Sequence, residues 1–270
     1  YTSFKQLITA MRSNMSGVFK LASDMTADEV GITDNQTSYL SGEFTGTLIG
    51  ADGSKAYAIY DLKKPLFDTL KNATVKDLDL KNTQVDSKEN AAAVAKTADN
   101  ATISNVAVEG KVSGRKSVAG LVVDATNTRI ENSSFSGKLV ANHADNNANY
   151  AGGIVGKLTG GNAKVDKSKV DAVISTAARN NNQTAGGIAG KLENGALVTR
   201  SVTTGKILNG RGYSRIGGIV GSTYPRGRVD NVVSNMNVGD GYATTGDQFG
   251  SADVKNAITY VENKKQDKIK

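Results

Sequence analysis

Short runs of branched apolar residues, each preceded by small residues, recur at a nearly constant interval along the chain. The glycine just before the branched residue is Gly120, Gly153, Gly187 or Gly218, so the steps are 33, 34 and 31 residues. A period of this length indicates a repeat architecture. In each copy the glycine is followed by one large apolar residue, and we expect these residues to stack on one another inside the fold: Leu121, Ile154, Ile188 and Ile219.

A second apolar phrase follows the first at a distance of about nine to eleven residues. Its leading residues are Ile130, Val165, Val198 and Val229, and the same spacing extends back to Ile103 and Val75. Six units therefore begin near Leu66, Val94, Leu121, Ile154, Ile188 and Ile219. The pattern predicts an array of similar units rather than one globular core.

Within the units the apolar residues have the spacing of strands. Val106 and Val108 lie two residues apart, Val, Ile and Thr are frequent, and Asn- and Gly-rich clusters separate the runs. Helical repeats would show apolar stripes at intervals of three and four, and propeller blades of about 40–45 residues carry recurrent aromatic signatures. The chain has no Trp. We therefore predict an all-β fold, a right-handed parallel β-helix of about seven coils, each coil being 27–35 residues long.

The two ends of the chain depart from the repeat. Residues 3–15 predict a helix, with Ser3 as its N-cap and one apolar face made by Phe4, Leu7, Ile8, Met11 and Met15. Such a helix would cap the open end of a solenoid; the alternative is a helix leading from an upstream domain. We expect a cap with the first strands at 1–50, the β-helix at 51–240, and a strand or linker to the next domain at 241–270.

Composition narrows the classes of function. Lys and Arg number 33 against 26 Asp and Glu, a moderate excess without a basic block interleaved with aromatics, so we expect no nucleic-acid partner. No apolar run is long enough to predict a membrane span. The chain has no Cys, which excludes disulfides and thiolate chemistry and favours a Gram-positive origin for an extracellular protein. It begins with Tyr1 rather than Met, so we expect a segment of a longer protein.

Several phrases resemble a known family. The segments 44–50 and 58–67 and the Gly-Gly-Ile-Val-Gly copies at 152–156 and 217–221 are similar to GLUG-type repeats of bacterial surface proteins. The whole chain resembles the β-helical region of streptococcal IgA1 proteases and their sister zinc metalloproteases. That resemblance implies a large secreted enzyme at the cell wall or surface of a Gram-positive bacterium, a virulence factor whose zinc endopeptidase domain cleaves the hinge of host immunoglobulin A1 or another host glycoprotein.

The catalytic motif of that family, His-Glu-x-x-His, is absent from this sequence. His143 is the single histidine, and a zinc site without Cys needs at least two imidazoles or a dense set of carboxylates. The repeat slot that holds Asp77 holds Asn105 and Asn132 in later units, then Lys167 and Arg200, which indicates turn residues rather than paired catalytic acids. We therefore predict no catalytic residue, metal ligand or cofactor in this segment, with zinc held by the catalytic domain of the parent protein.

One polar pattern suggests a surface for a partner. Lys111, Lys138 and Lys206 share one slot of the repeat, interrupted by Val173, and Lys157 and Lys191 share another. These lysines are either ordinary solvated surface or a sparse basic line that meets an acidic or glycosylated partner. The sequence thus predicts a non-catalytic module that positions a host protein substrate or braces its own catalytic domain. The alternative is a free-standing carbohydrate-binding or adhesive β-helix.

Overall fold

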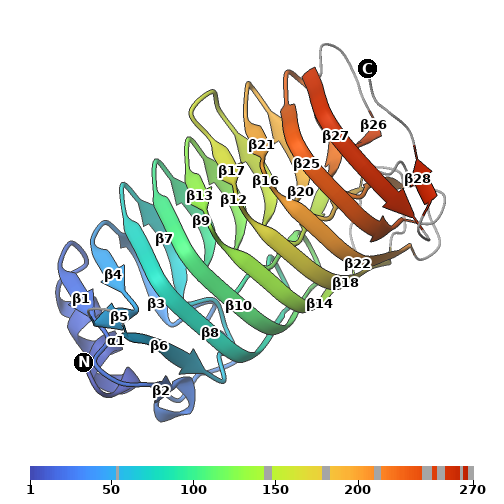
Figure 1. The fold of residues 1–270 in the computed structure, drawn as a ribbon. Helices are drawn as coiled ribbons and strands as arrows, with labels where there is room; N and C mark the ends of the chain where they lie inside the picture. Colours follow the sequence, from blue (N-terminus) through green and yellow to red (C-terminus); the bar gives the residue numbers. More distant parts are fainter. Residues whose placement is uncertain are drawn as a thin grey trace.

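The computed structural model forms an elongated parallel β-solenoid of about six turns with a helix at its N-terminal end (Figure 1). The residues described are 1–52, 55–142, 148–177, 183–209, 214–238, 245–247, 253–261 and 264–266. Among them, strands repeat in the same order in each coil and pair in parallel with the equivalent strands of the coils before and after. The predicted all-β solenoid with an N-terminal helical cap is confirmed, and the expected count of seven coils is close to the observed one.

Two stacks of strands belong to one large sheet, which bends at a corner of each coil. The first stack contains β1 (Val18–Lys20), β4 (Thr47–Ile49), β8 (Thr74–Ser87), β10 (Thr102–Gly114), β13 (Arg129–Glu131), β17 (Lys164–Asp166), β21 (Leu197–Thr199), β25 (Arg228–Asn237) and β27 (Asp253–Val261). The second stack contains β2 (Met25–Thr26), β6 (Lys55–Tyr60), the later parts of β8 and β10, β14 (Ser134–Asn142), β18 (Lys169–Ala177), β22 (Val202–Asn209) and the later part of β25. The parallel ladder thus begins at β1 and continues past residue 240.

Two further sheets complete the cross-section. One contains β3 (Leu40–Phe44), β7 (Phe67–Lys71), β9 (Ala95–Asp99), β12 (Val122–Thr126), β16 (Val155–Thr159), β20 (Ala189–Glu193), β24 (Val220–Ser222) and β26 (Thr245–Asp247). The other contains β11 (Val118–Ala119), β15 (Asn149–Gly152), β19 (Gln183–Gly186) and β23 (Ser214–Gly217). Antiparallel pairs occur where β5 (Ala51–Asp52) meets β6 and β28 (Lys264–Gln266) meets β27.

The core is a file of apolar side chains along the axis. Val75, Ile103, Ile130, Val165, Val198 and Val229 are partners in successive coils, and none is exposed. Each of these side chains lies on its equivalent one coil away, so neither coil can bury its own apolar residues alone. This is the stacking that the second apolar phrase of the sequence describes.

The first coils hold larger side chains. Phe44 lies 6.0 Å from Phe19 and 4.8 Å from Phe67, measured between ring centroids. Helix α1 (Phe4–Ser13) buries its apolar face at this end, and the ring of Phe4 meets that of Tyr39 edge-on at 5.0 Å. Ser3 caps the helix by accepting a hydrogen bond from the Gln6 amide. A short 3₁₀ helix, η1 (Ala27–Glu29), packs beside α1.

Candidate interaction surface

The corner between the first two strand stacks is a turn that successive coils, from β8 to β27, make with one residue in the left-handed conformation. Its φ angles lie between 48° and 55°, and the residues are Asp77, Asn105, Asn132, Lys167, Arg200, Asn231 and Asn256. Asn and Asp adopt this conformation more readily than other residues with a Cβ, which explains why five of the seven are Asn or Asp. Adjacent turn side chains also bond: Asn105 Nδ2 donates to Asp77 Oδ1 at 2.9 Å. Residues at this position of the repeat therefore form the turn and bond to their equivalents in neighbouring coils.

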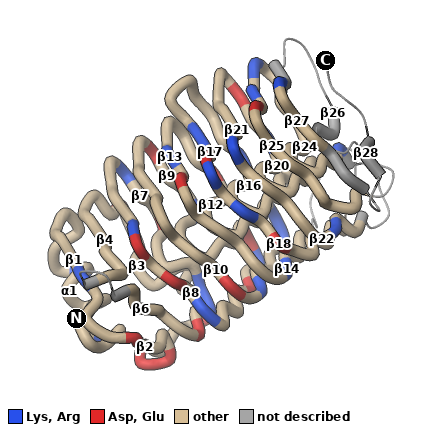
Figure 2. The backbone as a smooth tube through the Cα atoms, in the orientation of Figure 1, with Lys and Arg blue, Asp and Glu red and all other residues tan. Residues whose placement is uncertain are grey.

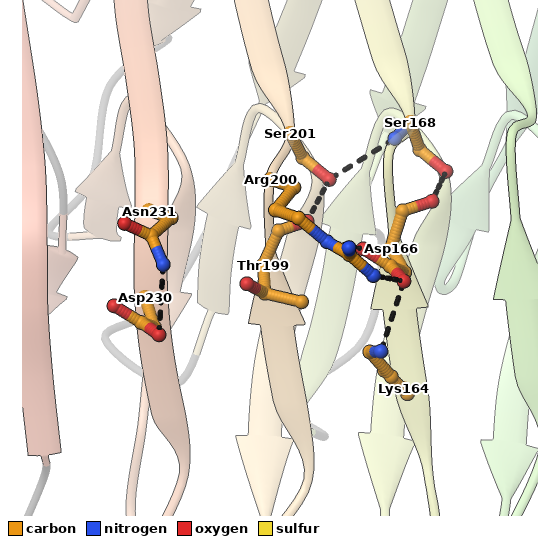
Figure 3. A network of polar contacts seen from close by, with 8 residues as sticks. All are labelled: Lys164, Asp166, Ser168, Thr199, Arg200, Ser201, Asp230 and Asn231. Atoms are coloured by element: carbon orange, nitrogen blue, oxygen red, sulfur yellow. Dashed lines mark hydrogen bonds and ion pairs between the residues drawn. The ribbon is translucent and has the colours of Figure 1, made fainter.

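Hydroxyl groups tie these corners together beneath the surface. Ser168 Oγ donates to the carbonyl of Asp166 at 3.0 Å, and the Ser168 amide donates to Ser201 Oγ of the next coil at 3.1 Å. Ser201 Oγ in turn donates to the carbonyl of Thr199 at 2.7 Å (Figure 3). Each hydroxyl therefore closes its own turn and accepts from the coil before it, which satisfies backbone groups that the turn leaves without strand partners.

Asp166 forms the most buried ion pair at this corner. Its side chain is 6% exposed and receives Arg200 from the following coil in a two-pronged contact, with Nε donating to Oδ1 at 2.7 Å and Nη2 contacting Oδ2 (Figure 3). Lys164 Nζ lies 2.9 Å from Oδ2. Burial alone raises the pKa of Asp166, but the hydrogen bonds from Arg200 and Lys164 outweigh it, so the pKa lies below the usual value. The Asp166 carboxylate therefore joins its own coil to the next one through these ion pairs.

The lysines that share one slot of the repeat lie in a single row of the second stack. Lys111 pairs with Lys138, Lys138 with Val173, and Val173 with Lys206 in the parallel register. All three lysines are exposed. Among the described residues none of them has an ion-pair partner, so their charges are available to solvent or to a bound molecule.

The first stack carries a second basic row, which the repeat pattern described above does not include. Arg129 pairs with Lys164, Lys164 with Leu197, and Leu197 with Arg228, one position before the apolar file (Figure 2 shows the charged positions along the coils). Aligning the residue that precedes Ile130, Val165, Val198 and Val229 would have revealed it. Two members of the row already have partners, because Lys164 contacts Asp166 and Arg228 donates to the carbonyl of Gly195.

The glycine-rich repeat lies where coils meet most closely. A Cβ at Gly153 would overlap the carbonyl oxygen of Gly187, and a Cβ at Gly187 would overlap that of Gly218. At Gly120 it would overlap the carbonyl oxygen of Gly153. The apolar residues that follow are fully buried: Leu121, Ile154, Ile188 and Ile219. Their main chains form a ladder in which the amide of each of the first three donates to the carbonyl of its equivalent in the next coil at 2.8–3.1 Å.

Two other glycines of the repeat, Gly152 and Gly190, lie where the four-stranded sheet meets the eight-stranded sheet. We call this junction the re-entrant angle. A Cβ at Gly152 would lie 2.8 Å from the amide nitrogen of Gly190, and one at Gly190 would lie 2.9 Å from Tyr150 Cβ. Three fully buried residues outside the main core, Ala92, Ala119 and Val123, fill the same re-entrant angle in earlier coils. The Gly-Gly-Ile-Val-Gly phrase thus serves both a coil-to-coil contact and a sheet-to-sheet contact.

Lys157 and Lys191 flank this re-entrant angle and are neutralised locally. Both ammonium groups lie 5.8 Å from the centre of the Tyr150 ring, Lys157 is 3.8 Å from Asp124, and Lys191 pairs with Glu193. Burial raises the pKa of Tyr150, and the nearby Lys157 opposes that rise. Unlike Lys111 and its partners, this row is not a free positive surface.

No group of three or more His, Cys, Asp or Glu residues that could hold a metal ion occurs in the described ranges. His143 lies outside those ranges. Across the same ranges, no helix combines the length and the apolar character needed to cross a membrane.

A β-solenoid with these repeats is the class of module that the fold defines, and comparison with known proteins shows which of them the chain resembles. Residues 1–110 match the family described as M26 IgA1-specific metallo-endopeptidase N-terminal region. The resemblance read from the sequence is confirmed: the chain corresponds to the β-helical region of the IgA1 protease-type zinc metalloproteases.

Particular relatives match over nearly the whole chain. Zinc metalloprotease ZmpC of Streptococcus pneumoniae serotype 4 is 70% identical over 100% of this chain, and the immunoglobulin A1 protease of Streptococcus sanguinis is 40% identical over 98%. The chain spans only 14% and 15% of these relatives. A solved structure of an IgA1 protease superposes with a TM-score of 0.89 at 36% identity, covering 96% of this chain and 21% of that one. A Bacteroides ovatus protein, described as a putative immunoglobulin A1 protease, shares the fold at 18% identity and a TM-score of 0.58.

Proposed function

We propose that this chain is the non-catalytic β-helix module of a secreted, cell-wall-associated zinc metalloendopeptidase, which positions a host protein substrate or braces the catalytic domain. The observation that carries the proposal is the full-length match to a segment making up 14% of a zinc metalloprotease. The parent enzyme would hold its zinc in a separate catalytic domain. Its substrate would be immunoglobulin A1 or another host glycoprotein.

The solenoid suits a positioning role for a physical reason. Its coils hold surface groups at fixed spacings, so a bound substrate loses orientational freedom before it reaches a catalytic centre elsewhere. The exposed row of Lys111, Lys138 and Lys206 is the candidate contact for an acidic or glycosylated partner. The effect of such a row would be strongest at low salt, where exposed charges are least screened.

Deleting this segment from the full-length enzyme tests the proposal. We expect cleavage of the intact protein substrate to fall more than cleavage of a short peptide that spans the cleaved bond, because the peptide relies only on the catalytic domain. An equal loss on both substrates, in a deletion variant whose catalytic domain keeps its melting temperature, would assign a bracing role. Undiminished activity on both would overturn the proposal.

The isolated chain gives a second test of the same proposal. We expect no cleavage of either substrate and no tight zinc binding by isothermal titration calorimetry, since the sequence contains one imidazole and no thiolate. In the full-length enzyme, removal of zinc by a chelator should abolish cleavage, and added zinc should restore it. Proteolysis by the isolated chain would contradict a non-catalytic module.

A further inference from the structure

A polar groove opens where the ends of β8, β10 and β14 approach the loop that follows the N-terminal cap. Its volume is about 580 Å³, within the range of pockets that hold small ligands, roughly 300–1,000 Å³. Its lining is charged or hydrogen-bonding throughout apart from one glycine, Gly114, and includes no aromatic or aliphatic side chain. Such a surface cannot gain from burying apolar groups, so any ligand must be recognised by polar contacts.

Both signs of charge face this groove without pairing. The basic residues Lys88, Lys111 and Arg115 and the acidic residues Asp34 and Asp86 have no ion-pair partner within the described part of the chain. Elsewhere the common arrangement is a pair between adjacent coils, as in Lys96 with Asp68, Lys71 with Glu43, and Lys157 with Asp124. The groove is therefore a place where donors and acceptors share one hollow and remain available.

The main chain holds these groups in place. The amides of Arg115 and Lys116 donate to the carbonyl of Glu89 at 3.2 and 3.3 Å, which docks the turn after β10 onto the preceding coil. A Cβ at Gly114 would lie 2.9 Å from that same carbonyl oxygen, so only glycine permits the approach. Lys64 Nζ also donates to the carbonyl of Asp86, at 3.5 Å. The floor of the groove is preorganised, which lowers the entropic cost of binding.

From this arrangement we propose that the groove binds a carboxylate-bearing saccharide. Each sugar hydroxyl both donates and accepts hydrogen bonds, and the groove supplies donors together with the carboxylates of Asp34 and Asp86. The guanidinium of Arg115 suits a planar carboxylate, and Lys88 and Lys111 add positive charge beside it. A peptide would bring apolar side chains that find no complementary surface here. The inference concerns the chain itself and does not rest on the proposed protease role.

Titration of the 270-residue chain tests the assignment, with amide chemical shifts as the readout. The probes are sialyllactose, which carries one terminal carboxylate, trigalacturonate, which carries one on each sugar, and neutral lactose. We expect at least one of the acidic saccharides to bind with shifts centred on residues 86–89 and 111–115, and lactose to bind at least tenfold more weakly. The stronger acidic probe distinguishes a sialylated glycan from a uronate polymer.

Matched variants separate the groove from general surface charge. Arg115→Gln should weaken binding of the acidic saccharide about tenfold, which corresponds to about 1.4 kcal/mol. Lys169→Gln removes one positive charge from an exposed side chain that lies outside the groove and outside the lysine row, and should leave binding unchanged. Circular dichroism checks that both variants fold. The proposal is overturned by no binding of either acidic probe at millimolar concentration, by equal binding of lactose or of a glutamate-rich peptide, or by an equal loss in Lys169→Gln.

Discussion

Replacing Gly187 with Ala adds one methyl group at the tightest kind of contact in the solenoid. The new Cβ would overlap the carbonyl oxygen of Gly218 in the next coil and lie 2.7 Å from Thr203 Cγ2. The carbonyl is main chain, so no rotation of a side chain can relieve the overlap. The two coils would have to separate locally, which also lengthens the hydrogen bond from the Ile188 amide to the Ile219 carbonyl, now 2.8 Å.

The expected cost follows from these two effects. Overpacking in a filled core costs typically about 1–3 kcal/mol, and weakening one buried hydrogen bond adds about 1 kcal/mol. Because the atom that is met is main chain, we expect the upper part of that range, about 3–4 kcal/mol. For a chain of this size, that loss lowers the melting temperature by roughly 6–15 °C.

Gly161→Ala is the matched control, since nothing lies within 4 Å of a Cβ built at that exposed glycine. Its stability should stay within about 0.5 kcal/mol of the parent chain. Urea titration followed by circular dichroism compares the two variants, and hydrogen exchange of the amides in 186–192 reports local opening of the coil. Equal midpoints for Gly187→Ala and Gly161→Ala would refute the close coil contact.

Two further predictions concern the corner of the coils. Asp166→Asn should cost about 1–2 kcal/mol near pH 7, because the charge-assisted bonds from Arg200 and Lys164 are lost. Since folding lowers the pKa of Asp166, its stabilisation is complete above the unfolded value of about 3.9 and disappears as the pH falls through the folded value. The gap between variant and parent, measured by urea titration, should therefore close in acid, and a gap that stays constant down to about pH 2 would contradict the ion pair. Lys167→Asn should stabilise the chain by about 0.5–1 kcal/mol, because Asn tolerates the φ of 48° better than Lys does; a lower melting temperature would count against this reading.

The repeat in the sequence predicts the buried residues of the coils more completely than it predicts the charged rows on their surface. The ladder of Leu121, Ile154, Ile188 and Ile219 could be read directly, because inward residues of a solenoid must be apolar in every coil and so repeat visibly. The alignment of Lys111 with Lys138 and Lys206 was also readable, since a strand of constant length carries its register from coil to coil. The row of Arg129, Lys164 and Arg228 follows from the same alignment of equivalent positions, because each of these residues directly precedes a buried apolar residue.

Other features had no signature in the sequence. Arg200 reaches Asp166 across 34 residues, and the preference of its slot for Asn gave no hint of an ion pair. The groove joins Asp34, Asp86 and Arg115, which belong to the loop after the cap and to the ends of two different strands. Loop lengths vary between coils, so the repeat does not specify which loop side chains meet.

The sequence by itself determined the class of fold, the coil length, the glycine contacts and the N-terminal helix, because each follows from a local pattern of side-chain size and polarity. The tertiary structure decided which charges are neutralised and which remain free. Lys157 and Lys191 look like Lys111 and Lys138 along the chain, yet the re-entrant angle places acidic partners beside the first pair and leaves the second exposed. That outcome depends on how the sheets bend towards one another, and the bend is a property of the packed coils rather than of any one repeat.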